Sequence, residues 1–413
     1  MINRLFFDIS PQVSAYEALL SEQKSVGYYH LPEQNLEYLQ EFKEAFEKEN
    51  KEIKHLVIIG IGGSSLGLKA IYRTLKNVKK FSRRIHFLES TDPIAIKTEL
   101  EKIELEKAHF FVVSKSGTTI ETMAIYKYIL NLLASQNITD EYRFTYVTDK
   151  GSSLEKHAKT KKSFCLHVSE NVGGRFSVLS AVGLGPLCLI EADIKALLEG
   201  ALEIKKSFFE AGYMRDILLK KATFYAKNSM KYNINALFVY SESFKYFSEW
   251  YVQLWGESLG KKQLHSSFNV GLTPVGLIGP KDQHSFLQLI VEGLRDKSVT
   301  FLKIEDFNYD VSIPDIKLEA LEEMDNINNL SFNTLINLQA DSVIDSLIQK
   351  GDIPVDTITL ERIDEKNIGK FIYYYELLTS LVANLMGVEA YGQPGVEESK
   401  KILKEKLKDK RLL

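Results

Sequence analysis

The stretch His55-Leu-Val-Ile-Ile-Gly-Ile-Gly-Gly-Ser-Ser-Leu-Gly67 joins a short apolar run to a glycine-rich turn, and helical periodicity follows from Leu66 to Leu75. A buried strand that stops at glycine and leads into a helix is typical of one unit of a parallel α/β sheet. In open α/β sheets, ligands bind outside the carboxyl ends of the strands. We therefore expect the functional residues in the loops that follow the strands.

The same kind of unit recurs along the chain. Helical segments, notably 119–133, separate most of the apolar runs, and residues 10–52 carry apolar residues at helical spacing on a charged background. The stretch from Asp193 to Met230 is largely helical and is interpreted as a connection between domains. We expect further strands at 85–89, 109–113, 144–147, 164–168, 235–240, 298–304 and 357–360.

The C-terminal part contains a long predicted helix at about 367–386 and a charged helix after Pro394. The whole pattern predicts an α/β protein with two tandem domains and mainly parallel sheets, preceded by N-terminal helices and closed by a C-terminal helix. We expect residues 1–210 to hold the N-terminal helices and the first domain, and residues 211–413 to hold the second domain and the last helix.

Composition excludes several classes of protein. The chain has 413 residues, 45% of them apolar and 26% charged, and a net charge of −3, so we expect neither nucleic acid nor a membrane as a partner. Cys165 and Cys188 are too few for a disulfide framework and fit a reducing compartment. The eight histidines form no HxxH or HExxH pair, so no metal site is expected. Without an 18-residue apolar run or a signal segment, a cytoplasmic location is expected.

The glycine-rich turn at 60–67 leaves alternatives open. A P-loop needs Gly-Lys-Ser/Thr at its end, but Leu68 follows Gly67, so that interpretation fails. A dinucleotide fingerprint needs glycine or alanine where Ser65 stands, although Glu89, after the next strand, could bind a ribose. A tight turn without a ligand is the plainer alternative.

The second loop, Ser114-Lys-Ser-Gly-Thr-Thr-Ile-Glu-Thr122, is more informative. Thr118 and Glu121 fit a capping box for the helix that begins there. A cap needs only one hydroxyl, whereas this loop offers several together with a lysine. Free amides at the start of a helix, surrounded by hydroxyl donors, suit a phosphate group. The loop therefore predicts binding of a phosphomonoester.

Four further segments carry candidate residues. Glu170 to Ser177 places Arg175 beside paired glycines, where a charge would be costly if it served packing alone. Taken singly, Glu257 in Gln253 to Lys261 would be read as a solvated surface residue, and His284 in Gly279 to Phe286 as a helix cap or surface residue. The last segment, Tyr391 to Lys400, opens the C-terminal helix.

In this order, the six segments resemble the glucose-6-phosphate isomerase (phosphoglucose isomerase) family from about residue 58 to residue 401. The most specific are Glu170 to Gly183, with Gly-Gly-Arg-Phe-Ser at its centre, and Gln393-Pro-Gly-Val-Glu-Glu-Ser-Lys400. The resemblance implies two sugar-isomerase (SIS) domains, a homodimer and no cofactor. It also reveals a departure, since Gly392 stands where many relatives carry a polar residue.

The resemblance also implies roles for individual residues. Glu257 would be the base that moves a proton between C2 and C1, and Arg175 would stabilise the charge of the enediol intermediate. His284, reaching the site from the partner subunit, would open the sugar ring with help from Lys400. Gln253 and Gln393 would line the sugar. The substrate phosphate would be bound by Gly63, Ser64, Ser114, Lys115, Ser116, Thr118 and Thr119.

The chemistry agrees with these roles, because aldose–ketose isomerisation needs a carboxylate to shuttle a proton and a cation near the developing oxyanion. We therefore expect reversible conversion of D-glucose 6-phosphate to D-fructose 6-phosphate. The alternatives are a bifunctional phosphoglucose/phosphomannose isomerase and a non-enzymatic SIS-domain sugar-phosphate sensor. The last is a dehydrogenase that binds a nicotinamide cofactor at the glycine-rich turn.

Overall fold

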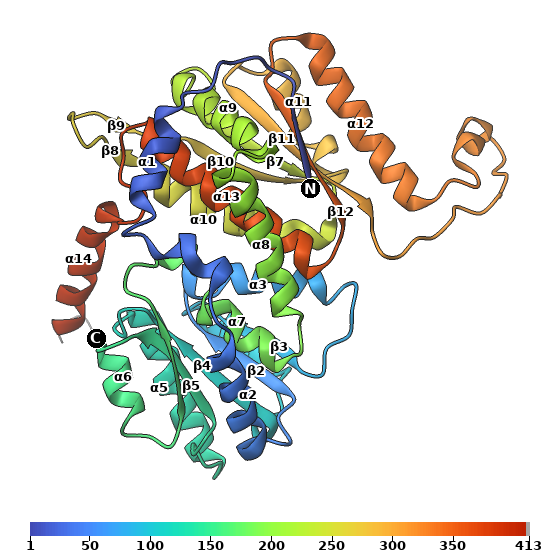
Figure 1. Cartoon of the computed structure of the whole chain (residues 1–413). Helices are drawn as coiled ribbons and strands as arrows, with labels where there is room; N and C mark the ends of the chain where they lie inside the picture. The colour runs from blue at the N-terminus through green and yellow to red at the C-terminus, as the bar shows by residue number, and fades with distance from the viewer. Residues whose placement is uncertain (410–413) are drawn as a thin grey trace.

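Five parallel strands form the first sheet of the computed structural model, which describes residues 1–409 (Figure 1). They follow the order β3-β2-β4-β5-β6 and comprise β2 (His55–Ile59), β3 (Arg84–Leu88), β4 (Ala108–Val113), β5 (Phe144–Asp149) and β6 (Phe164–Val168). Every neighbouring pair is parallel. All five predicted strands of this half are therefore confirmed.

Both faces of this sheet are covered by helices, as expected for buried parallel strands. Leu56 and Ile58 of β2 lie in one apolar cluster, whereas Val57 and Ile59 lie in another. The first face packs against α2 (Glu37–Glu49), α3 (Leu66–Leu75) and α7 (Ala181–Leu189), and the second against α4 (Pro93–Leu100), α5 (Ile120–Ser135) and α6 (Ser153–Ala158).

The second sheet has the order β1-β12-β11-β7-β10, and only β1 is antiparallel to its neighbour. Its strands are β1 (Ile2–Leu5), β7 (Ile234–Val239), β10 (Thr273–Ile278), β11 (Lys297–Asp306) and β12 (Val355–Arg362). One face packs against α8 (Ile194–Phe209), α9 (Tyr213–Lys227), α10 (Lys245–Leu259) and α13 (Glu365–Leu385), and the other against α11 (Leu287–Glu292) and α12 (Phe332–Lys350). The prediction of two α/β units in tandem is confirmed.

The largest apolar cluster runs through both halves, and α13 lies in it. The backbones of helices α8 and α13 are in close contact at two glycines. A Cβ on Gly200 would lie 1.9 Å from Lys366 O, and one on Gly369 would lie 1.9 Å from Leu197 O. The stretch interpreted as a connection between domains is thus part of the core of the second half, and α8 and α13 cross beside each other in Figure 1.

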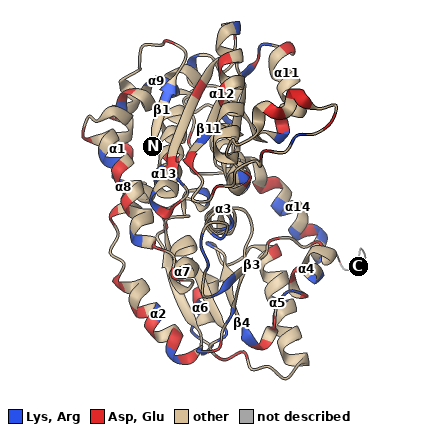
Figure 2. Cartoon of the chain, turned by 90° about the vertical axis from the view of Figure 1, so that its right-hand side faces the viewer, with Lys and Arg blue, Asp and Glu red and all other residues tan. Residues whose placement is uncertain are grey.

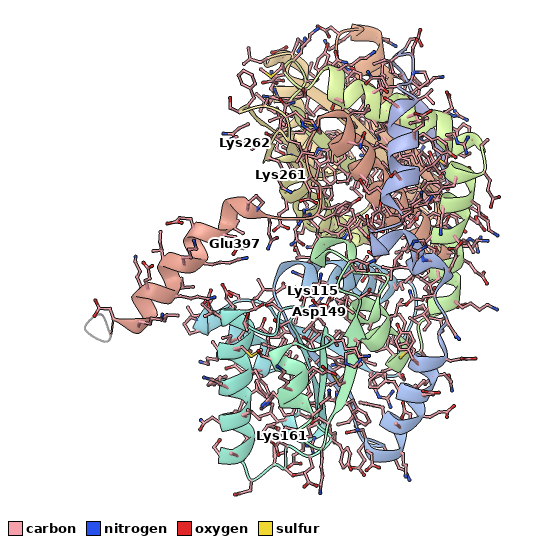
Figure 3. All side chains as sticks on the ribbon, turned by 60° about the vertical axis from the view of Figure 1, so that its left-hand side comes forward. Lys115, Asp149, Lys161, Lys261, Lys262 and Glu397 are labelled. Carbon is pink, nitrogen blue, oxygen red and sulfur yellow. The ribbon has the colours of Figure 1, made fainter. Side chains whose placement is uncertain are left out.

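The sequence predicted neither two strands of the second sheet, β1 and β10, nor the short pair β8 (Lys261–Lys262) and β9 (Asn269–Val270). The expected division placed residues 2–5 in the first half, but they pair with β12 in the second sheet. The other elements outside the sheets are α1 (Ser14–Glu22), the short pair β8 and β9, and α14 (Glu397–Lys408). All residues of α14 are exposed, and Figure 3 shows this helix projecting from the body of the molecule.

Within residues 1–409, no helix is both long and apolar enough to cross a membrane. Cys165 and Cys188 are both free thiols, and burial raises their pKa values to about 11 and about 12. Cys188 is buried, as expected, but Cys165 is only half-buried because it lies on the edge strand β6.

Candidate active site

The loop of residues 114–119 follows β4, the central strand of the first sheet, and leads into α5. Its backbone turns at Gly117, whose φ of +71° lies in the left-handed region that favours glycine. Its hydroxyls are paired with one another: Ser114 Oγ lies 2.9 Å from Thr119 Oγ1, and Ser116 Oγ lies 3.2 Å from Thr118 Oγ1. The loop therefore gathers four hydroxyls at the carboxyl edge of the sheet.

The capping box predicted from Thr118 and Glu121 is wrong. Thr119 is the N-cap of α5, and no side chain accepts a hydrogen bond from the first turn. The amide of Thr118 instead donates to Ser116 Oγ at 3.3 Å, because the hydroxyls of this loop bond within the loop. The first amides of α5 are thus left without a side-chain partner, an arrangement that suits an anion.

Lys115 ties the phosphate-binding candidate loop to its neighbours. Its ammonium donates to Glu170 O at 2.6 Å and lies 4.0 Å from Asp149 Oδ2. Its carbonyl accepts from the Asp149 amide and from Thr148 Oγ1, both at 3.1 Å. Burial raises the pKa of Asp149. Figure 3 labels Lys115 and Asp149 at the end of the first sheet that faces the second half.

The glycine-rich turn packs directly against the loop that carries Arg175. A Cβ on Gly63 would lie 2.4 Å from Gly174 O, so only glycine allows this approach. Ser64 lines a cavity of about 10 Å³ that Lys115 and Ser177 also line. The glycine-rich turn with Gly63 and Ser64, the 114–119 loop with Lys115 and the loop that carries Arg175 are far apart in the sequence. They meet at the carboxyl ends of the first sheet.

Glu89, the residue that a dinucleotide site would need for a ribose, is already paired. Its carboxylate lies 2.5 Å from Lys69 Nζ and accepts a hydrogen bond from Ser65 Oγ at 3.1 Å. Lys69 also pairs with Glu249 of α10 at 3.2 Å. These contacts connect the two halves and leave the dinucleotide alternative without its ribose acceptor.

Arg175 is buried, and each of its guanidinium nitrogens has a partner. Nε donates to Ser258 Oγ at 2.7 Å, and Nη1 lies 3.3 Å from Glu257 Oε2. Nη2 donates to Gly392 O at 3.1 Å and also to Ala390 O. Burial lowers the pKa of Arg175, and the charge of Glu257 opposes that effect. The cation is therefore held in one position, aimed at the carboxylate of α10.

Glu257 and Gln253 lie one helical turn apart on α10 and share a face of it. The side chain of Glu257 is 35% exposed, and of its two oxygens only Oε2 has a partner within residues 1–409. Gln253 Oε1 is buried without a hydrogen bond, and Nε2 lies 2.8 Å from the place of a Cβ on Gly62. The second half thus presents Glu257 and Gln253 to the loops of the first.

The remaining predicted residues are not brought to Glu257 in the single chain. His284 is exposed and has no hydrogen bond or ion pair within residues 1–409. Lys400 pairs with Glu397 at 2.7 Å on the projecting helix α14. Gln393 is exposed but directly follows Gly392, which contacts Arg175. All three residues are exposed in the single chain.

Sequence reasoning assigned no role to several residues at the site, although it noted Gly392 as a departure from the family. Ser258, Ala390 and Gly392 bind Arg175, and Lys261 donates to the same carbonyl of Gly392. Ser258 and Lys261 stand within the quoted segment 253–261, but their spacing does not reveal these contacts. Ser258 contacts Arg175, 83 positions away, and Lys261 contacts Glu389 and Gly392, 128 and 131 positions away. Over residues 1–409, no three His, Cys, Asp or Glu side chains form a group that could hold a metal ion.

Charge is distributed evenly over the rest of the molecule. Figure 2 shows acidic and basic residues mixed along the helices of both halves. The structure therefore shows no broad basic surface within residues 1–409 that would attract anions, and the local donors at the carboxyl ends of the first sheet are the candidates for binding one.

Comparisons with known proteins agree with this geometry. The family model described as phosphoglucose isomerase matches residues 33–411. A glucose-6-phosphate isomerase of Campylobacter jejuni is 42% identical over 407 residues, covering 97% of this chain and 98% of its own length. A probable glucose-6-phosphate isomerase of Methanococcus maripaludis is 35% identical over 390 residues, covering 92% and 83%.

Solved structures show a related fold. A hypothetical protein of Thermus thermophilus is 31% identical, with a TM-score of 0.87 and coverage of 96% of this chain and 94% of that one. A glucose-6-phosphate isomerase of Chlamydia trachomatis is 23% identical, with a TM-score of 0.78 and coverage of 98% and 77%. The second likeness concerns the fold alone.

Proposed function

This chain belongs to the phosphoglucose isomerase family, and we propose that it catalyses the reversible isomerisation of D-glucose 6-phosphate to D-fructose 6-phosphate. This step is shared by glycolysis and gluconeogenesis. The observation that carries the proposal is the buried Arg175 cation, 3.3 Å from Glu257, across from a loop of four hydroxyls. The two features match the two ends of an open-chain sugar phosphate.

Proton transfer between C2 and C1 is assigned to Glu257. One of its oxygens pairs with Arg175, and the other, Oε1, is free of partners within residues 1–409 and can take a carbon-bound proton. Removal of that proton leaves negative charge on the oxygens of a cis-enediol. Arg175 lies fixed beside the base and stabilises this charge without having to reorganise. The same carboxyl then returns the proton to the neighbouring carbon.

The phosphate is assigned to the first half, with Gly63, Ser64, Ser114, Lys115, Ser116, Thr118 and Thr119 as its binding residues. Amides at the start of α5 and the hydroxyls of the loop can donate to a dianion. Binding at the phosphate, away from the reacting carbons, supplies energy for orientation. Gln253 and Gln393 are assigned to the sugar hydroxyls between the two ends.

Ring opening is assigned to His284 with help from Lys400, and His284 would come from a second copy of the chain. The exposed His284 and the projecting helix α14 support a homodimer in which His284 comes from the partner subunit. Exposed apolar side chains lie on α14 and just before it, at Val396, Ile402, Leu403 and Leu407. A partner could cover them. We propose that this dimer works in the cytoplasm, without a cofactor or a metal.

One experiment tests the reaction directly. Fructose 6-phosphate is incubated with the protein in D₂O, and deuterium entry at the exchanging carbon is followed by NMR together with the formation of glucose 6-phosphate. An isomerase that uses an enediol gives both signals. A protein that only senses sugar phosphates gives neither, and this result would refute the proposal.

A parallel assay with mannose 6-phosphate defines the specificity. Glucose and mannose 6-phosphates differ only in configuration at C2, and they share the enediol. Conversion of mannose 6-phosphate at a comparable rate would make the enzyme a bifunctional phosphoglucose/phosphomannose isomerase, whereas a far slower rate would support the glucose-specific assignment.

A further inference from the structure

A short segment of the second half, residues 389–392, lies between two cations and is here called the strap. Lys261, which follows the end of α10, donates from its ammonium to Glu389 O at 2.7 Å and to Gly392 O at 2.6 Å. Arg175 donates to Ala390 O and to the same Gly392 O at 3.1 Å. Figure 3 shows Lys261 beside the chain that leads into α14. The strap thus connects Lys261 to the catalytic cation.

The strap is also closed on itself. The carboxylate of Glu389 accepts hydrogen bonds from the amides of Tyr391 at 2.5 Å and Gly392 at 2.6 Å. A Cβ on Gly392 would lie only 2.8 Å from Glu389 Oε2, so glycine at this position lets the carboxylate fold over the backbone. A larger residue at position 392 would therefore require the end of the Glu389 side chain to move.

The strap is also anchored through the side chain of Tyr391. The hydroxyl of Tyr391 donates to Glu22 Oε1 of the N-terminal helix α1 and lies 2.9 Å from Ser380 Oγ of α13. Because the strap is fixed at Tyr391 and Glu389, its carbonyls can hold a cation in place. Besides Arg175, Lys261 also donates to Gly392 O, and its charge makes this hydrogen bond stronger than one from a neutral donor.

From this geometry we infer that Lys261 is a positioning residue: it fixes the strap so that the guanidinium of Arg175 stays aimed at Glu257. The inference rests on the proposed isomerase function. Lys261 acts through Arg175, and no contact joins it to the 114–119 loop in the part of the chain that the structure describes. Its loss should therefore slow the chemical step and leave phosphate binding intact.

The chain supplies a matched control. Lys262 is the next residue in the same short strand and is exposed, and its side chain has no hydrogen bond or ion pair within residues 1–409. Lys261→Met removes the charge and keeps much of the side chain, whereas Lys261→Arg keeps the charge. Lys262→Met makes the same chemical change one residue away.

The test measures kcat and KM for fructose 6-phosphate in the three variants and the wild type. Loss of a hydrogen bond from a charged group should lower kcat of Lys261→Met by about 10- to 100-fold, with KM changed less than about two-fold. Lys261→Arg should recover much of the rate, and Lys262→Met should equal the wild type. An unchanged kcat in Lys261→Met, or a loss only in KM, overturns the inference.

A double variant separates positioning through Arg175 from an independent effect. In an Arg175→Ala background, adding Lys261→Met should cost less than about two-fold in kcat, because the residue that Lys261 positions is already gone. A loss as large as in the wild-type background overturns the inference.

If Lys261→Met does not fold, as judged by circular dichroism, Lys261→Gln takes its place with the same expectations. An inactive wild type would refute the proposed function itself, whereas an active wild type with an unaffected Lys261 variant refutes this inference alone.

Discussion

Arg175 and Glu257, the proposed catalytic pair, are buried to different degrees. The guanidinium is buried, and such a charge is costly unless every nitrogen has a partner, which is the case here. Glu257 remains 35% exposed and keeps one oxygen free. The family resemblance singled out both residues, but nothing in the sequence predicted the contacts to Ser258 and Gly392 that fix the cation.

Glu257→Gln tests the base at the scale of a single functional group. The amide keeps the size of the side chain but cannot accept the carbon-bound proton, so kcat should fall by about 10²–10⁴-fold. KM should change little, because the phosphate-binding loop lies in the other half. Steady-state kinetics and deuterium exchange in D₂O provide the measurement, and substantial exchange by the variant would remove Glu257 from the mechanism.

The hydroxyls of the 114–119 loop lead to a second prediction. Ser116→Ala combined with Thr119→Ala should raise KM for the sugar phosphate sharply, because donors to the dianion are lost. Stability should fall by only about 1 kcal/mol per lost hydrogen bond, and no helix cap is lost, since no side chain caps α5. Ser135→Ala, an exposed hydroxyl at the other end of α5, is the control. An unchanged KM in the double variant would show that the phosphate binds elsewhere.

At the scale of elements, the sequence predicted the inner strands and missed two edge strands for physical reasons. β10 contains Pro274 and Gly276, which argue against a central strand but are tolerated at an edge, where β10 lies. β1 is short and polar, and Asn3 is buried only because its side chain donates to Asp356 Oδ2 at 2.8 Å. A contact over 353 positions leaves no local signal in the sequence.

Helix α13 carries a buried acid that makes stability depend on pH. Glu376 is fully buried, neither of its oxygens has a hydrogen-bond partner within residues 1–409, and burial raises its pKa well above the usual range. The unfolded chain ionises this group near pH 4.5, so above that pH the folded state binds more protons than the unfolded state. The contribution of Glu376 to the free energy of unfolding therefore falls as pH rises.

Glu376→Gln should remove this dependence, because an amide does not ionise. The free energy of unfolding of the variant, relative to the wild type, should increase between pH 5 and pH 8 when both are unfolded in urea. Glu323→Gln changes an exposed glutamate and should leave the difference constant with pH. A constant difference for Glu376→Gln as well would show that the carboxyl is not held neutral.

At the scale of the whole molecule, the two halves contribute different parts of one site. Loops at the carboxyl ends of the first sheet carry the hydroxyls and Arg175, whereas α10 and the strap of the second half carry Glu257 and the carbonyls that hold Arg175. The family resemblance implied separate roles for the 114–119 loop and for Glu257, and the two lie in different halves of the structure. In the single chain, His284 is exposed and Lys400 lies on the projecting helix α14, and we propose that a second copy brings His284 to the site.

The last prediction concerns that second copy. Glu257→Gln protein and His284→Ala protein are denatured together and refolded. If His284 acts across the interface of a two-fold symmetric dimer, each mixed dimer has one site with both defects and one with neither. Random pairing makes half of the dimers mixed, so about a quarter of wild-type activity should return. Ring opening also proceeds slowly in water, so the residual activity of His284→Ala alone is measured and subtracted.

Activity equal to the average of the two variants would mean either that His284 acts within its own subunit or that no dimer forms. Size-exclusion chromatography with light scattering distinguishes these two cases, because only the second gives a particle with the mass of one chain.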